Sequence, residues 1–179
     1  GILTNIAGPV QFSCKLLQNS TLPATNPEAN NEFYEKLTNL RKEISAVEDV
    51  VANMDNRLKN INAALLDMPS TPTDLLKRAY DLNNQLDNAT IILFGDNSKS
   101  KREFESNTSV SDRIYGAIYS LWNSTSNIPT TYNTSINTAS AQLKSSLAKL
   151  KSIYENIQSI EKELDMKNAP FSPGRLPKW

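Results

Sequence analysis

The chain has no histidine, few glycines and one cysteine in its 179 residues. The lack of histidine removes Ser-His and Cys-His nucleophilic pairs, imidazole bases and histidine metal ligands. Its 5 glycines form neither a phosphate-binding loop nor a dinucleotide fingerprint. Cys14 has no partner for an internal disulfide, and we interpret it as a small apolar residue of a strand-like segment. We therefore expect no enzymatic activity, no cofactor and no metal site.

Charge and hydropathy argue against two further classes of partner. Lysine plus arginine and aspartate plus glutamate each number 19, so the chain has no overall positive field of the kind that nucleic acids or anionic membranes attract. No apolar run approaches the roughly 20 residues of a membrane span. Because the first residues lack the order of a signal peptide, the chain is either cytosolic or a piece of a longer exported protein.

The dominant pattern is an apolar stripe over residues 33–65, in which the gaps alternate between four and three. The stripe consists of Phe33, Leu37, Leu40, Ile44, Val47, Val51, Met54, Leu58, Ile61 and Leu65. This spacing places the side chains on one face of a helix and is typical of long helices that pack at a shallow angle. Asn26 and Pro27 predict the start of this helix, and Pro69 predicts its end.

Three more helices with the same spacing are predicted after a short connection. They occupy about 72–95, 109–129 and 130–166, with Thr71, Ser109 or Ser111, and Thr130 as their N-caps. The last helix nearly matches the first in length, and Ser146 is the one polar member of its stripe, which predicts a local shift of the stripe or a close helix approach. The sequence thus predicts an all-α, antiparallel up-down-up-down bundle of two long and two shorter helices.

Two terminal segments flank the bundle, which we assign to residues 26–166. The N-terminal arm, residues 1–25, alternates apolar and polar residues from Val10 to Leu16. It is interpreted as the last strand of an upstream domain, an arm laid on the bundle, or a partly ordered leader. The C-terminal tail, residues 167–179, is rich in proline, and we predict that it folds back on the bundle. Its predicted docking residues are Phe171, Arg175 and Trp179.

Several side chains are candidates for a functional role. An aromatic group is interpreted as core or, alternatively, as the lining of a pocket between helices; it consists of Tyr115, Tyr119, Trp122 and Tyr132. The basic residues within 96–108 favour a solvated loop over an anion-binding patch. Carboxylate pairs such as Glu161 and Asp165 are interpreted as charges on a wet surface.

Five stretches carry a resemblance to a known family. They are PVQF at 9–12, NSTLPA at 19–24, SVSDRI at 109–114, STSNIPT at 124–130 and APFSPGRLPKW at 169–179. In this order they resemble the C-terminal region of bacterial secreted sortilin-like, BNR-type β-propeller proteins, which are often labelled glycosyl hydrolase-like. Phe171 and Ser172 depart from the tryptophan and threonine that the family more often has there.

The resemblance implies a terminal helical module of a larger exported protein, located in the periplasm, on the cell surface or outside the cell. It places the propeller upstream and no catalytic position of the family in this segment. The leading hypothesis is therefore a non-catalytic structural or interaction module, with the upstream propeller and further copies of the chain as expected partners. The alternative is an extracytoplasmic ligand-sensing bundle.

Overall fold

The computed structural model describes residues 8–15, 21–70, 72–173 and 175. Its helices are α1 (Pro27–Leu66), α2 (Thr73–Phe94), α3 (Asn97–Ser100), α4 (Val110–Leu121) and α5 (Thr130–Met166). Within these described ranges no strand is present. The two long helices pack together in a bundle, which confirms the predicted all-α fold with two long and two shorter helices.

The ends of the helices follow local capping chemistry. The Asn26 side chain accepts a hydrogen bond from the Ala29 amide at 3.1 Å, so α1 begins as predicted. Ser109 and Asp112 form a capping box at the start of α4, which identifies Ser109 as the cap. Thr130 is the first residue of α5 and Pro129 holds the cap position, so the cap predicted at Thr130 is wrong by one residue. Thr71, predicted to cap α2, lies outside the described residues.

The two long helices run parallel, which differs from the predicted up-down-up-down order. Near the starts of α1 and α5, Lys36 Nζ donates to Asn137 Oδ1 at 2.7 Å. In their second halves, Arg57 Nη2 donates to Glu161 Oε2 at 2.6 Å. Contacts between equivalent parts of two helices require that both helices point the same way. An up-down-up-down bundle would place the start of α1 beside the end of α5.

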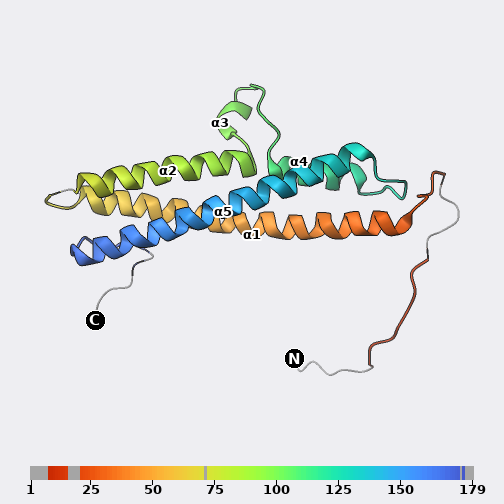
Figure 1. Cartoon of the computed structure of the whole chain (residues 1–179), viewed down its shortest axis with the longest axis horizontal. Coiled ribbons are helices and arrows are strands. Elements are labelled where there is room, and N and C mark those ends of the chain that lie inside the picture. Colours follow the sequence, from red (N-terminus) through yellow and green to blue (C-terminus); the bar gives the residue numbers. More distant parts are fainter. Residues whose placement is uncertain (1–7, 16–20, 71, 174, 176–179) are drawn as a thin grey trace.

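The shorter helices α2 and α4 lie end to end and form the third rod of the bundle (Figure 1). Arg78, near the start of α2, pairs with Glu163 near the end of α5 at 2.8 Å. The Tyr34 hydroxyl, near the start of α1, lies 3.3 Å from the carbonyl oxygen of Leu121 at the end of α4. Both short helices therefore run opposite to the long ones. They contain 22 and 12 residues, so end to end they cover most of the 40-residue α1.

The connection between α2 and α4 begins and ends at nearly the same point of the third rod. Gly95 ends α2 with φ +89°, and a Cβ added there would lie 3.8 Å from Cβ of Ser109, which caps α4. The intervening residues, with α3, protrude from the bundle (Figure 1). Because this excursion does not reverse the chain, α4 continues the direction of α2. Side by side, the two short helices would have left half of each long helix uncovered.

The predicted apolar stripes form the core. Every member of the α1 stripe is buried, and Leu58 and Leu65 are fully enclosed. In α5 the buried positions continue through Ser146, while Leu147 is exposed. The stripe therefore passes through Ser146 without the shift that was one of the two expectations. The core is continuous over a rod of ~60 Å, the length of a 40-residue helix.

The parallel order of α1 and α5 predicts a definite set of distances. In a Cys14→Ser background, spin labels at Lys36 and Asn137 should give a short distance by pulsed electron resonance. Labels at Lys36 and Lys162 should lie about 37 Å further apart along the rod, because 25 helical residues separate the two α5 sites. The reverse order of the two distances would show that the long helices are antiparallel.

Candidate functional site

The aromatic residues of α4 lie on its outer side. Tyr115 and Tyr119 in α4 and Trp122 at its C-cap are spaced by four and three residues, on a side of the helix next to its buried stripe. Tyr119 is 80% exposed and Trp122 is 75% exposed, while Tyr115 is half-buried. The interpretation of Tyr119 and Trp122 as core is therefore wrong. In a bundle of three rods, each helix covers only two neighbours, so much of its circumference faces outward.

Two of these rings border hollows between α1 and α4. Trp122 borders a groove of about 210 Å³, whose lining consists of Tyr34, Leu37, Thr38, Arg41, Ile118, Leu121 and Trp122. Tyr115 borders an adjoining hollow of about 540 Å³, lined also by Thr38, Arg41, Lys42, Ser45, Ala46 and Asp49. Tyr132 is partly buried against the core from the start of α5 and lines neither hollow. The predicted group of four aromatics thus does not converge on one pocket.

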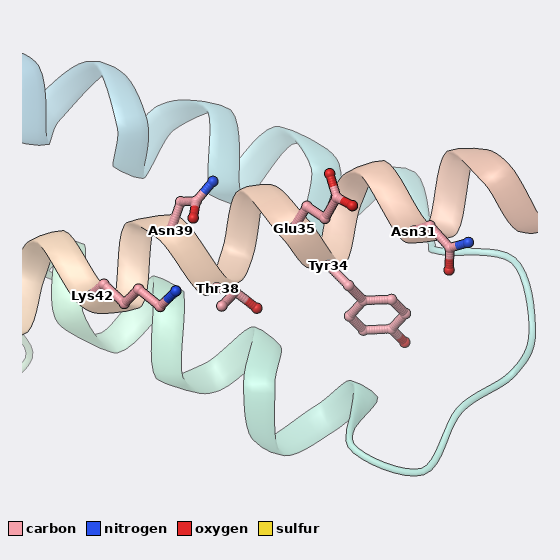
Figure 2. A pocket seen from close by; sticks show the side chains of 6 residues that line it. All are labelled: Asn31, Tyr34, Glu35, Thr38, Asn39 and Lys42. Carbon is pink, nitrogen blue, oxygen red and sulfur yellow. The ribbon is translucent and has the colours of Figure 1, made fainter. Parts of the chain in front are cut away.

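Figure 2 shows a third hollow on the outer surface of α1, with a volume of about 510 Å³. Its lining comes from α1 alone: Asn31, Tyr34, Glu35, Thr38, Asn39 and Lys42. Tyr34 and Thr38 are shared with the groove beside Trp122, so the hollows form one surface, which we call the α1–α4 face. Sequence reasoning missed this face. The available signal was a second set of small and charged residues at helical spacing on α1.

Tyr34 fixes the end of α4 against α1. Its hydroxyl lies 3.3 Å from the carbonyl oxygen of Leu121 and 3.2 Å from that of Ser124, so it can donate to either carbonyl group at the C-terminal end of α4. Burial raises the pKa of the Tyr34 phenol above its ordinary value. The groove beside Trp122 therefore has one firmly held wall.

Glu161 and Asp165, predicted to be surface charges, both bind arginine side chains. Arg57 binds Glu161 through two hydrogen bonds of 2.8 and 2.6 Å, and both side chains are largely buried. The hydrogen bond to Glu161 raises the pKa of Arg57, whose guanidinium also lies 4.9 Å from the centre of the Tyr154 ring. The interpretation of Glu161 as a wet surface charge is wrong, because the pair ties α1 to α5.

The C-terminal tail meets the end of α5 through Arg175, which is only 7% exposed. Its Nε and Nη2 donate to Asp165 Oδ1 at 2.8 and 2.6 Å, and its Nη1 donates to the carbonyl oxygen of Pro170 at 2.7 Å. Phe171 is 60% exposed, so the expectation that this ring leaves the solvent is wrong. Its centre lies 5.6 Å from the Arg175 guanidinium. Trp179 lies outside the described residues.

The N-terminal arm is fastened to the bundle only at its root in the described part of the chain. Ser126 Oγ donates to the carbonyl oxygen of Leu22 at 2.9 Å, and the Ala24 amide donates to the carbonyl oxygen of Thr125 at 3.2 Å. Residues 8–15 are extended and exposed along their whole length (Figure 1). Cys14 is a free, exposed thiol. For these residues, the alternative of an arm laid on the bundle does not hold.

The basic loop around α3 is solvated, in agreement with the favoured interpretation. Asp96 caps α3, and the hydrogen bond from Ser98 lowers the pKa of its carboxyl group. Lys99 lies 3.7 Å from Asp96, and Lys101 and Arg102 are exposed.

The comparisons with known proteins do not supply a family. No protein-family model, no curated protein and no solved structure matches the chain. Among the described residues, no group of three or more cysteine, aspartate and glutamate side chains is placed to hold a metal ion. None of the described helices is both long and apolar enough to cross a membrane.

The Arg175 contacts predict a marked effect on stability. Arg175→Ala should lower the free energy of unfolding by about 2–3 kcal/mol, because several hydrogen bonds to a charged group are lost together. Arg175→Lys should recover only part of this, since an ammonium lacks the planar fork. Urea unfolding followed by circular dichroism measures both changes, with Lys167→Ala on the exposed neighbouring surface as control. A change below about 0.5 kcal/mol for Arg175→Ala would contradict the assignment.

Proposed function

We propose that the chain is a non-catalytic structural and interaction module that forms the C-terminal part of a larger exported, propeller-bearing protein. In this proposal the bundle acts as a stiff spacer, and the N-terminal arm joins it to the upstream domain. The resemblance of the five sequence stretches suggests the propeller and the extracytoplasmic location. The arm is the single structural observation that carries the proposal.

The arm has the properties of a segment that pairs with a body outside the bundle. Val10 and Phe12 are 80% and 86% exposed, and their alternation with polar residues places both side chains on one side of an extended segment. Such a segment gains hydrogen bonds and apolar burial by adding to the edge of a sheet. The root of the arm, at Leu22 and Ala24, is held by the loop between α4 and α5.

The rest of the bundle suits a spacer. Its core is continuous from end to end, and ion pairs such as Arg57–Glu161 and Arg78–Glu163 link its rods. A ligand-sensing function gains little support from the aromatic residues, because Tyr119 and Trp122 face outward and line open surface. Ligand-sensing pockets of bundles are more enclosed.

The reading frame upstream of Gly1 tests the proposal most directly. We expect it to encode repeated four-stranded blades preceded by an export signal. An upstream frame without such blades, or a start codon directly before Gly1, would overturn the proposed function.

In the longer protein, the two sides of the arm should respond differently to charge. Val10→Asp with Phe12→Asp should speed proteolytic cleavage of the arm by about tenfold or more, because buried carboxylates disrupt pairing with the upstream sheet. Gln11→Asp with Ser13→Asp is the matched control on the opposite side and should change cleavage little. The melting temperature of the bundle should stay constant in both. Equal cleavage of the two variants would contradict the proposed pairing.

A further inference from the structure

The outer side of α1 carries a second regular stripe, opposite the one that forms the core. Its members are exposed and spaced by four and three residues: Thr38, Lys42, Ser45, Asp49 and Ala52. Four of these five residues, all except Ala52, also line a hollow of the α1–α4 face. A regular stripe of this period is suited to another long helix at a shallow angle. The small side chains at its centre permit close approach of the helix axes.

The charges beside this stripe are ordered along the helix. Arg41 and Lys42 lie one turn before Ser45, and Glu48 and Asp49 lie one turn after it. All four are exposed, and in the part of the chain that the structure describes none of them forms an ion pair. The positive and negative groups are thus placed symmetrically about one point.

We propose that two copies of the chain pair through this face, with their α1 helices antiparallel and the two-fold axis at Ser45. A two-fold axis perpendicular to the helix brings residues before the centre opposite residues after it, and the two that face each other share one flank of the helix, as residues seven apart do. Lys42 then faces the partner's Asp49, and Arg41 faces the partner's Glu48. Each contact occurs twice because the interface is self-complementary. This pairing goes beyond the proposed function, because it does not require an upstream domain.

The order of the charges along α1 indicates that the partner at this face is a second copy of the chain, with its α1 antiparallel. A parallel pairing in the same register would set Lys42 against Lys42 and Asp49 against Asp49. Like charges directly opposite one another destabilise an interface, whereas the antiparallel pairing sets opposite charges together in all four of these charged contacts. The arrangement on α1 is therefore complementary to itself after reversal, which is the property that an isologous dimer requires.

The exposed ring of Trp122, the residue that follows α4, supplies apolar area beside the charged contacts. Trp122 lines the groove that Arg41 and Thr38 also line, so it belongs to the same face. An aromatic side chain buries roughly 150–250 Å² when covered. Trp122 is 75% exposed, so most of its surface is available for such burial. A standard interface buries about 800 Å² on each partner. The helix surface around Ser45 can supply the remainder.

The oligomeric state of the whole chain is the first measurement. Sedimentation equilibrium should show a monomer–dimer equilibrium at concentrations up to ~1 mM, which covers weak association. Association should weaken as salt is raised, because the ion pairs are at the surface. A chain that remains monomeric throughout this range would overturn the proposal.

A charge exchange then tests the register. Lys42→Glu and Asp49→Lys should each weaken association by about tenfold or more, because two attractive contacts become repulsive. The double variant Lys42→Glu with Asp49→Lys should regain most of the lost affinity, since the opposite charges again face each other. Lys144→Glu, an exposed reversal on α5, is the matched control and should leave association unchanged.

Measuring the association of a Trp122 variant in the same way distinguishes this interface from other modes of pairing. Trp122→Ala should weaken the dimer by about tenfold, since a covered aromatic residue is a typical hot spot of an interface. All substituted side chains are exposed, so helicity by circular dichroism should match the parent chain and exclude misfolding. A dimer that ignores the single reversals, or a double variant no tighter than the singles, would overturn the proposed pairing. Neither result bears on the upstream domain.

Discussion

The burial of one continuous apolar stripe on α1 is the constraint on which the rest of the structure depends. A helix of 40 residues that buries one face along its whole length needs partners that extend equally far. α5 meets this need as a single helix of 37 residues, and α2 with α4 meets it in two pieces. The end-to-end placement of the short helices and the protruding loop between them follow from this requirement.

Polar contacts set the order and the ends of the rods, while the apolar core supplies their cohesion. The stripes have the same period in every helix. A helix could therefore shift along its neighbour, or point the other way, with little loss of buried apolar area. Specific pairs remove this freedom: Lys36 with Asn137, Arg57 with Glu161, and Tyr34 with the end of α4. Where α2 meets α4, Gly95 and Ser109 lie close together, so the residues between them form a loop that protrudes from the bundle. The tail closes the opposite end of α5 through Arg175.

The surfaces available for interaction are those that three rods leave uncovered. The arm begins at the loop between α4 and α5, at one end of the rod, and the α1–α4 face lies along the adjoining half. The attachment proposed for the arm and the pairing proposed for α1 therefore use different surfaces. A spacer that both joins an upstream domain and pairs with its own copy would bring two such domains together.

The helices and their inner faces were predictable from the sequence because helical periodicity is local. The alternation of apolar positions from Phe33 to Leu65, the cap at Asn26 and the stop at Pro69 depend only on neighbouring residues. The outer face was partly predictable, since the charges around Ser45 follow the same spacing. Its exposure to solvent was not predictable, because the sides of α1 that stay uncovered depend on how many rods surround the helix.

The sequence by itself determined four main helices, the residues that form their common core, and the helix boundaries to within a few residues. The exception is α4, which ends at Leu121 and not near residue 129 as predicted. Only the tertiary structure decided the direction of α4 and α5, because a stripe of period 3.5 is equally apolar whichever way its helix points. It also decided that Tyr119 and Trp122 face solvent, since three rods cover less of each helix than four. The burial of Arg175 likewise depended on the path of the tail, which brings a guanidinium back to a carboxylate on the preceding helix.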